Sequence, residues 1–418
     1  MRIRSPEPVT SLYAHVPFCA HKCEYCAFYS HTPAPDLVNR YVAALTRELE
    51  QVSSDLQPLT VFFGGGTPSL LNLRQWEKIL DAMQRLDLLG AFEWTVECNP
   101  ATVSLDKARL LRRYGVNRIS MGVQSFDEGL LDRIGRIHSR EMVFKSYDIL
   151  RLAGFDNINI DLMFAIPGQT MEIWSETLRE ALALQTEHLS CYEVIYEEDT
   201  PLFAQLKAGR FSVDEDLACD MYEKLVEEAG AHDFVQYEVA NFAKCRAQTS
   251  SKVANDHRAL ETDSEIPGWA CMHNINYWRG GSYYGIGPSA AGYLRGLRTK
   301  NWSNTALYCE QIEKGQRAIE WQEQLSPLDR AGETAAFGLR MNAGWPLQLF
   351  RKITGFDLRE YWAEPIALLI ERGFAHLDDT RFRLTPRGLR FADWAAEQFI
   401  QPMALAPDRP PRLEPAVK

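Results

Sequence analysis

An alternation of short apolar runs with longer amphipathic segments occupies residues 10–240 and constrains the fold more than any other feature. Each apolar run is rich in β-branched and aromatic residues, as strands are, and a segment with helical periodicity follows it. In the first such segment, Leu37, Tyr41, Leu45 and Leu49 keep one face apolar. The predicted strands are SLYAHV, LTVFFG, EWTVEC, NRISMGV, INIDLMF, HLSCYEVIY and FVQYEVANF.

Repeated strand–helix units predict a parallel sheet, because two parallel strands need a crossover between them. Such units build either an open doubly wound sheet or a barrel, and about six repeats favour a barrel or part of one. We therefore predict an α/β fold built on a partial (β/α)6 barrel of the TIM type. In both architectures the functional side chains lie at the carboxyl ends of the strands.

The alternation stops after about residue 305, where helical patterns predominate. Two strand-like pieces, FAHLD and RFRLT, flank the turn DDT, and a last helical pattern follows them. We therefore predict a barrel domain at 1–304 and a smaller, mostly helical, winged-helix-like domain at 305–403. A polar, aperiodic segment at 244–267 predicts an insertion within the barrel domain, and the polar tail at 404–418 predicts disorder.

Length and charge exclude several classes of protein. The 418 residues exceed the usual size of a single hydrophobic core, so more than one domain is expected. The formal net charge of −11 provides no general basic surface, so nucleic acid is not an expected partner. No apolar run has the length of a signal peptide core or of a membrane span, so we expect a cytoplasmic protein.

Three of the nine cysteines form a cluster. Cys19, Cys23 and Cys26 lie within eight residues, just after the first predicted strand. Three thiolates from one loop can hold three irons of a cubane cluster and leave its fourth iron open to another ligand. A zinc site completed by His21 or by a distant residue is the alternative that the bare pattern leaves open. We expect His15 and His21 to orient neighbouring groups rather than to bind metal.

Polar residues and a glycine run follow other predicted strands. GGGTPS at 64–69 follows the second strand, and its glycines allow the backbone to approach a ligand closely. Glu97, Gln124 and Asp161 lie at or near the ends of three successive strands, and Arg136 lies in the segment GRIH. Each of these residues alone has an ordinary structural explanation. Together they predict a polar site in the mouth of a barrel.

The motif CxxxCxxC, with an aromatic residue before its third cysteine, resembles that of the radical S-adenosylmethionine (SAM) superfamily. The resemblance implies a 4Fe-4S cluster on the three cysteines, and one-electron reduction of SAM to methionine and a deoxyadenosyl radical. It also implies that Glu97 meets the SAM amino group or backbone, that Gln124 and Asp161 bind its ribose, and that Arg136 pairs with its carboxylate. The full set of SAM contacts that it implies is Tyr13, Tyr25, Gly65, Gly66, Thr67, Glu97, Gln124, Arg136 and Asp161.

Further motifs resemble those of oxygen-independent coproporphyrinogen III oxidases and the related HemW-type haem chaperones. These motifs are FFGGGTPSLL, ECNP, RISMGVQSF, IDLMFAIPGQT, YEVANFA, HNINYW and ETAAFGLRMNAG. Phe28 stands where the oxidases carry one more cysteine, only 18 residues precede Cys19, and HNINYW resembles the chaperones' haem-associated motif. All three features favour a chaperone that delivers haem to an apo-haem protein and depends on an electron donor. Porphyrin-directed radical catalysis is the alternative.

The segment HNINYW contains the candidate haem-binding residues His273, Tyr277 and Trp278. An imidazole can ligate haem iron, and aromatic faces can pack against a porphyrin. Cys271 is a possible thiolate in its place. Equally, His273 can be a core histidine whose ring nitrogens are satisfied by hydrogen bonds, with the aromatic residues packed around it. The sequence leaves both interpretations open.

Overall fold

The computed structural model describes residues 8–246 and 264–400. Most of the predicted insertion, residues 247–263, and the whole predicted tail at 404–418 therefore lie outside the described residues. Within the described ranges, no helix combines the length and the apolar character that a membrane span requires. The chain divides into two compact units, and the first ends at Gln324.

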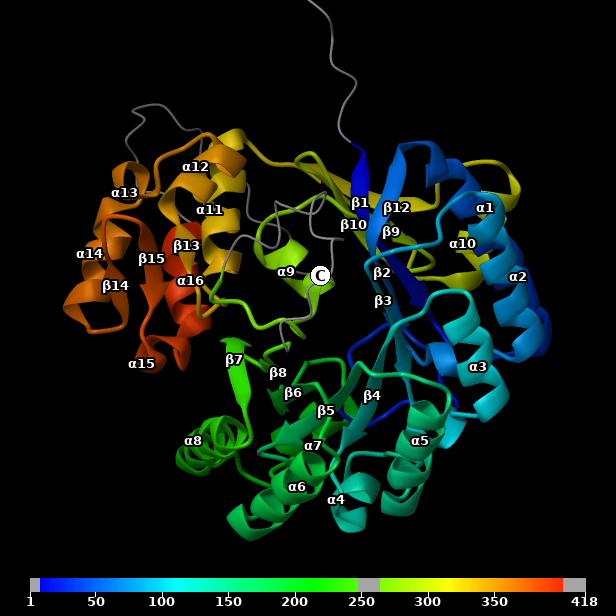
Figure 1. The fold of residues 1–418 in the computed structure, drawn as a ribbon, viewed down its shortest axis with the longest axis horizontal. Coiled ribbons are helices and arrows are strands. Elements are labelled where there is room, and N and C mark those ends of the chain that lie inside the picture. Colours follow the sequence, from blue (N-terminus) through cyan, green and yellow to red (C-terminus); the bar gives the residue numbers. More distant parts are fainter. Residues whose placement is uncertain (1–7, 247–263, 401–418) are drawn as a thin grey trace, which may run out of the picture. The chain divides into compact units, whose positions relative to one another are not determined.

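Six parallel strands form the centre of the first unit, and they pair side by side in chain order. Helices follow the strands and lie along the outer face of the sheet (Figure 1). The sheet confirms the predicted α/β fold with a partial barrel. The strands are β1 (Val9–Val16), β2 (Leu56–Gly65), β3 (Glu93–Cys98), β4 (Arg118–Gln124), β5 (Ile158–Phe164) and β6 (His188–Glu193). The helices are α1 (Pro35–Val52), α2 (Leu73–Arg85), α3 (Leu105–Arg113), α4 (Glu128–Arg133), α5 (Arg140–Leu152) and α6 (Met171–Ala183), with short 3-10 turns at Ser53–Asp55, Pro68–Leu70 and Pro100–Thr102.

The strands alternate between an apolar outer face and a polar inner face. In β5, Ile158, Ile160 and Leu162 belong to the hydrophobic core. Asn159 and Asp161 occupy the opposite face, because successive side chains of a strand point to opposite sides of the sheet. The amide of Asn159 donates to the Asp161 carboxylate over 2.7 Å, so the inner face is polar and internally hydrogen-bonded.

Both edges of the sheet differ from the simple repeat. The predicted strand FVQYEVANF forms a hairpin of β7 (Phe234–Glu238) and β8 (Asn241–Lys244), and no single strand with a following helix is present there. The chain turns because the Glu238 carboxylate accepts hydrogen bonds from the Ala240 N–H and the Asn241 amide. Strand β8 pairs antiparallel with β6, whereas β9 (Tyr284–Ile286) extends the other edge parallel to β1. Helices α7 (Pro201–Lys207) and α8 (Glu215–Ala231) connect β6 to β7.

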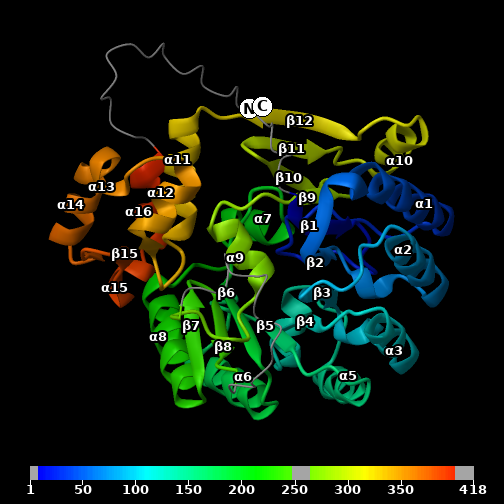
Figure 2. The same cartoon turned by 45° about the horizontal axis from the view of Figure 1, so that its top comes forward.

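The first unit extends beyond the boundary that we predicted at residue 304. Strand β12 (Ile319–Gln324) pairs with β11 (Leu297–Asn301), which pairs with β10 (Ala291–Leu294). Figure 2 shows these three strands side by side near β9. Helix α10 (Thr305–Glu313) packs against α1. These contacts hold residues 305–324 in the first unit, although their sequence pattern lacks the earlier alternation.

The second unit contains helices around a small antiparallel sheet, as predicted. The turn DDT joins β14 to β15, and β13 pairs with the other side of β15. Trp345, Phe350, Trp362, Phe382 and Phe399 fill its core. Its elements are α11 (Pro327–Gly338), β13 (Trp345–Pro346), α12 (Leu347–Thr354), α13 (Leu358–Tyr361), α14 (Ala363–Glu371), β14 (Ala375–Leu377), β15 (Arg381–Leu384), α15 (Pro386–Leu389) and α16 (Ala392–Ile400).

Candidate functional site

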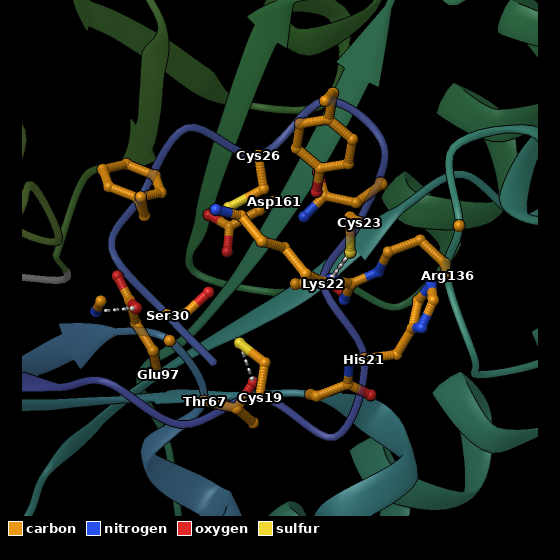
Figure 3. A pocket seen from close by; sticks show the side chains of 18 of the residues that line it. Cys19, His21, Lys22, Cys23, Cys26, Ser30, Thr67, Glu97, Arg136 and Asp161 are labelled. Atoms are coloured by element: carbon orange, nitrogen blue, oxygen red, sulfur yellow. Dashed lines mark hydrogen bonds between the residues drawn. The ribbon is translucent and has the colours of Figure 1, made fainter. Parts of the chain in front are cut away.

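The loop between β1 and α1 carries the three clustered cysteines into one pocket. Cys19, Cys23 and Cys26 are half-buried, and all three line a cavity of about 480 Å³ at the carboxyl ends of the parallel strands (Figure 3). Two hydrogen bonds close the base of the loop, from the Cys19 N–H to the His31 carbonyl and from the His31 N–H to the Pro17 carbonyl. The sequence therefore folds into a loop whose thiols share one cavity, as predicted.

A buried histidine fixes the far side of this loop. The Nε2–H of His15 donates to the Tyr29 carbonyl over 2.8 Å, and Nδ1 accepts from the Tyr13 hydroxyl over 2.9 Å. Burial lowers the pKa of His15, so its ring is neutral, as this pair of bonds requires. Tyr13 was expected to contact SAM. It is absent from the cavity lining and orients His15 instead.

The glycine run after β2 passes close beneath the cysteine loop. Gly65 has a φ of +104°, and a side chain there would overlap the His15 ring. A Cβ on Gly66 would lie 2.7 Å from the carbonyl oxygens of Val16 and Phe18. Thr67 Oγ1 lies 3.4 Å from the Cys19 sulfur. The glycines therefore allow the backbone to pass close to the cysteine loop, and Gly65, Gly66 and Thr67 all line the cavity.

Two carboxylates form the polar floor of the cavity. Burial, and then the neighbouring charge of Asp161, raise the pKa of Glu97 to about 8. Burial also raises the pKa of Asp161, although hydrogen bonds from Asn159 and Ser120 oppose the shift. The Gly65 N–H donates to Glu97 over 3.0 Å. This floor can bind a cation or a group with several hydrogen-bond donors, because either would compensate the buried carboxylates.

Gln124, Arg136 and Tyr25 also line the cavity. Gln124 ends β4 with a φ of 70°, in the left-handed region that residues other than glycine adopt only at a few positions. The Arg136 guanidinium donates to the Gly122 carbonyl and lies 3.7 Å from the Cys23 sulfur. Its buried Nε–H has no hydrogen-bond partner. The guanidinium therefore brings a positive charge to the cavity wall.

Several cavity residues were missed by sequence reasoning. Ser120, Gly122 and Met163 come from the same strands as predicted residues, and Tyr192 lies one residue before the end of β6. Alternation along the strands could have identified Tyr192, because it follows Ser190 by two positions and shares its face. Ile137 and Ile195 lie in loops whose course the alternation does not specify.

The donor set fits an iron–sulfur cluster bound to SAM. Three cysteines on one loop supply the soft ligands of such a cluster, and the Arg136 guanidinium and the buried carboxylates match the two ends of an amino acid. In the described part of the chain, no three His, Cys, Asp or Glu side chains converge closely enough to hold a single metal ion.

The segment HNINYW forms helix α9 (Met272–Trp278), and its histidine is buried. His273 Nδ1 lies 2.9 Å from the Thr60 hydroxyl, and Nε2 lies 2.7 Å from the Tyr277 hydroxyl. The ring stacks on Phe62 at a centroid distance of 5.2 Å. Burial, aided by Arg118, lowers the pKa of His273 to about 3. Both ring nitrogens are therefore engaged within a neutral, packed side chain.

The rest of this motif is also placed outside the cysteine cavity. Tyr277 and Trp278 are half-buried, and neither they nor His273 line the cavity. Burial raises the pKa of Cys271 to about 12, and its neutral thiol donates to Glu93. The same carboxylate accepts from the N–H groups of Met272 and His273 at the start of α9. In this structure His273 and Cys271 are therefore buried, hydrogen-bonded side chains, and Tyr277 and Trp278 lie partly exposed outside the cysteine cavity.

Comparison with known proteins identifies the two units separately. Residues 13–181 match the radical SAM superfamily, and residues 325–391 match the HemN C-terminal domain. The second match begins at the observed boundary between the units.

Similar proteins cover nearly the whole chain. The heme chaperone HemW of Lactococcus lactis is 34% identical over 93% of this chain and 97% of its own length. A mitochondrial radical S-adenosyl methionine domain-containing protein 1 from Mus musculus is 31% identical over 93% of this chain and 87% of its own. The solved coproporphyrinogen III oxidase (HemN) of Escherichia coli shares the fold with a TM-score of 0.77 at 21% identity, over 95% of this chain and 91% of that one. The chain therefore belongs to the HemW family of radical SAM proteins, which carry a 4Fe-4S cluster and SAM.

Proposed function

We propose that this protein is a haem chaperone, which binds haem and transfers it to an apo-haem protein. Relatives that bear the name heme chaperone match this chain over almost their entire length, which supports the proposal. The residue that favours the chaperone over the oxidase is Phe28. It lines the cavity at the position where oxidases are expected to have a cysteine. A phenylalanine provides no thiol for that chemistry, but it adds apolar surface beside the cluster.

The proposed ligands of the cluster are Cys19, Cys23 and Cys26. When bound, the cluster with SAM supplies one-electron chemistry. Burial raises the pKa of Cys26, so its thiolate depends on the positive charge of bound iron. The hydrogen bond from Thr67 and the guanidinium of Arg136 are placed to stabilise the sulfurs of Cys19 and Cys23.

The polar floor is the proposed seat of SAM. In this proposal Glu97 pairs with the SAM amino group and Arg136 with its carboxylate, so each contact joins opposite charges. Gln124 and Asp161 bind the ribose hydroxyls. The glycine run adds backbone contacts at Gly65 and Gly66, with Thr67 and Tyr25 on either side.

Anaerobic reconstitution of the full chain with iron and sulfide, followed by SAM and then haem, tests the chaperone function. We expect haem binding and transfer of haem to an apo-haem acceptor. With coproporphyrinogen III and a reductant as electron donor, we expect no decarboxylated product. Formation of protoporphyrinogen would instead establish the oxidase, the second function that the fold accommodates.

A further inference from the structure

The mouth of the cysteine cavity carries a group of exposed apolar side chains, here called the apolar rim. It consists of Phe28, Ile137, Tyr192 and Ile195, which are 67%, 49%, 42% and 68% exposed and all line the same cavity. Single exposed apolar residues are common on protein surfaces, whereas several gathered at one cavity mark a binding site. We propose that the apolar rim is the seat of the haem macrocycle, an inference that rests on the proposed haem chaperone function.

The rim and the floor of the cavity offer different chemistry. The rim comes from the cysteine loop, from the segment after α4 and from the end of β6 and the residues that follow it. The floor contains Glu97 and Asp161, with the three thiols beside them (Figure 3). A charged, polar ligand such as SAM matches the floor but leaves the rim uncovered. The cavity of about 480 Å³ has the size of a site for one ligand of that kind, so a macrocycle would lie across its mouth.

Haem matches the rim in shape and in charge. Its macrocycle is flat and apolar, whereas its two propionates are negative and lie at one edge. Lys22 is exposed on the cysteine loop, which also carries Phe28, and it lines the same cavity. Glu193 and Glu197 line the side formed by the end of β6 and the following segment. This charge distribution orients the propionates toward Lys22 and away from the two carboxylates.

Helix α9 offers no comparable seat. His273 is only 1% exposed, and both of its ring nitrogens are hydrogen-bonded. Coordination of haem iron there would first break these bonds and separate the ring from Phe62. The rim is accessible without any such rearrangement, so it provides the initial contact for haem.

Titration of the reconstituted full-length protein with ferric haem, followed by the Soret band, tests the seat. We expect Ile195→Asn and Phe28→Ser each to weaken haem binding about ten-fold, because burial of one large apolar side chain contributes roughly that much affinity. The matched control is Leu152→Asn at the end of α5, since Leu152 is 67% exposed and lies outside the cavity. The haem affinity of the Leu152 variant should equal that of the unsubstituted protein. The SAM affinity of all three variants should also be unchanged. Metal-free protoporphyrin IX should compete with haem, because the macrocycle supplies the contact.

The possible outcomes distinguish failure of the proposed haem seat at the apolar rim from failure of the proposed chaperone function. Equal haem affinity in the rim variants and the unsubstituted protein would overturn the seat and leave the chaperone function standing. Normal haem affinity combined with loss of transfer to an apo-acceptor would also overturn it, since the rim would then be a protein interface. Absence of haem binding by the unsubstituted protein would overturn the proposed function itself, and the seat with it.

Discussion

The cysteine cavity and helix α9 are the two regions that the sequence motifs single out, and they differ in how their polar groups are satisfied. In the cavity, Arg136 has a buried donor without a partner, and burial raises the pKa of Glu97. In α9, both ring nitrogens of His273 and the first N–H groups of the helix have protein partners. A buried polar group without a protein partner needs an explanation, and a bound ligand is one of them. The contrast supports ligand binding in the cavity and a packed state of His273 in α9.

Of the changes that test this contrast, loss of one of the three clustered cysteines should have the largest effect. We expect Cys23→Ser to abolish cluster assembly, because two thiolates cannot hold the three irons. Iron and sulfide analysis after anaerobic reconstitution measures the effect. Cys219→Ser is the matched control, since Cys219 is exposed on α8 and outside the cavity. Full cluster content in the Cys23 variant would refute the assigned ligand set.

The tight approach of the glycine run should appear as a loss of stability. Gly65→Ala combines an unfavourable positive φ with overlap of the His15 ring, and we expect it to destabilise the fold by about 2–4 kcal/mol. Gly154→Ala shares the positive φ, at +89°, but its new methyl group would meet no atom within 4 Å. Gly154→Ala should lower the free energy of unfolding by about 1 kcal/mol. Denaturant unfolding measures both, and similar losses would show that the overlap is unimportant.

A buried neutral histidine should make α9 sensitive to acid. The pKa of His273 falls from 6.5 to about 3 in the folded chain, so the unfolded chain takes up a proton first as the pH decreases. Folding stability should therefore fall between about pH 6.5 and 3, by about 1.4 kcal/mol per pH unit. His273→Gln should remove this part of the pH dependence and weaken the fold at neutral pH. If the difference in unfolding free energy between the two proteins were the same at every pH in this range, the packed, neutral state of His273 would be contradicted.

The smallest expected effect concerns the charge on the cavity floor. A bound ammonium group favours the Glu97 carboxylate, so SAM affinity should rise as the pH increases toward about 8 and fall again at higher pH, where the ammonium group itself loses its proton. Glu97→Gln should weaken SAM binding roughly ten-fold and abolish the rise. Equilibrium dialysis across the pH range measures it. Glu193→Gln at the cavity edge is the control, and an equal effect there would argue against a specific role for Glu97.

Much of the cavity could be predicted because its residues are close in sequence or recur at strand ends. The clustered cysteines, the glycine run and the polar residues in the carboxyl-terminal halves of β3, β4 and β5 all line one cavity, as parallel strands require. Tyr13 was expected among the SAM contacts, but it does not line the cavity. Tyr13 is close in sequence to the cysteine motif, but the sequence does not show that its hydroxyl is hydrogen-bonded to His15.

The order of apolar and polar residues along the chain determined the repeated strand–helix units, the site at their carboxyl ends and the clustering of the three cysteines, because these features depend on local periodicity and spacing. Tertiary contacts decided which of the two interpretations of His273 in HNINYW, a haem ligand or a packed core histidine, this structure shows. Thr60 is far from His273 in sequence, and its hydroxyl engages the ring only after β2 and α9 pack together. The apolar rim likewise arises only when the cysteine loop and the end of β6 reach the same mouth. Burial and exposure depend on such distant neighbours, which a motif does not contain.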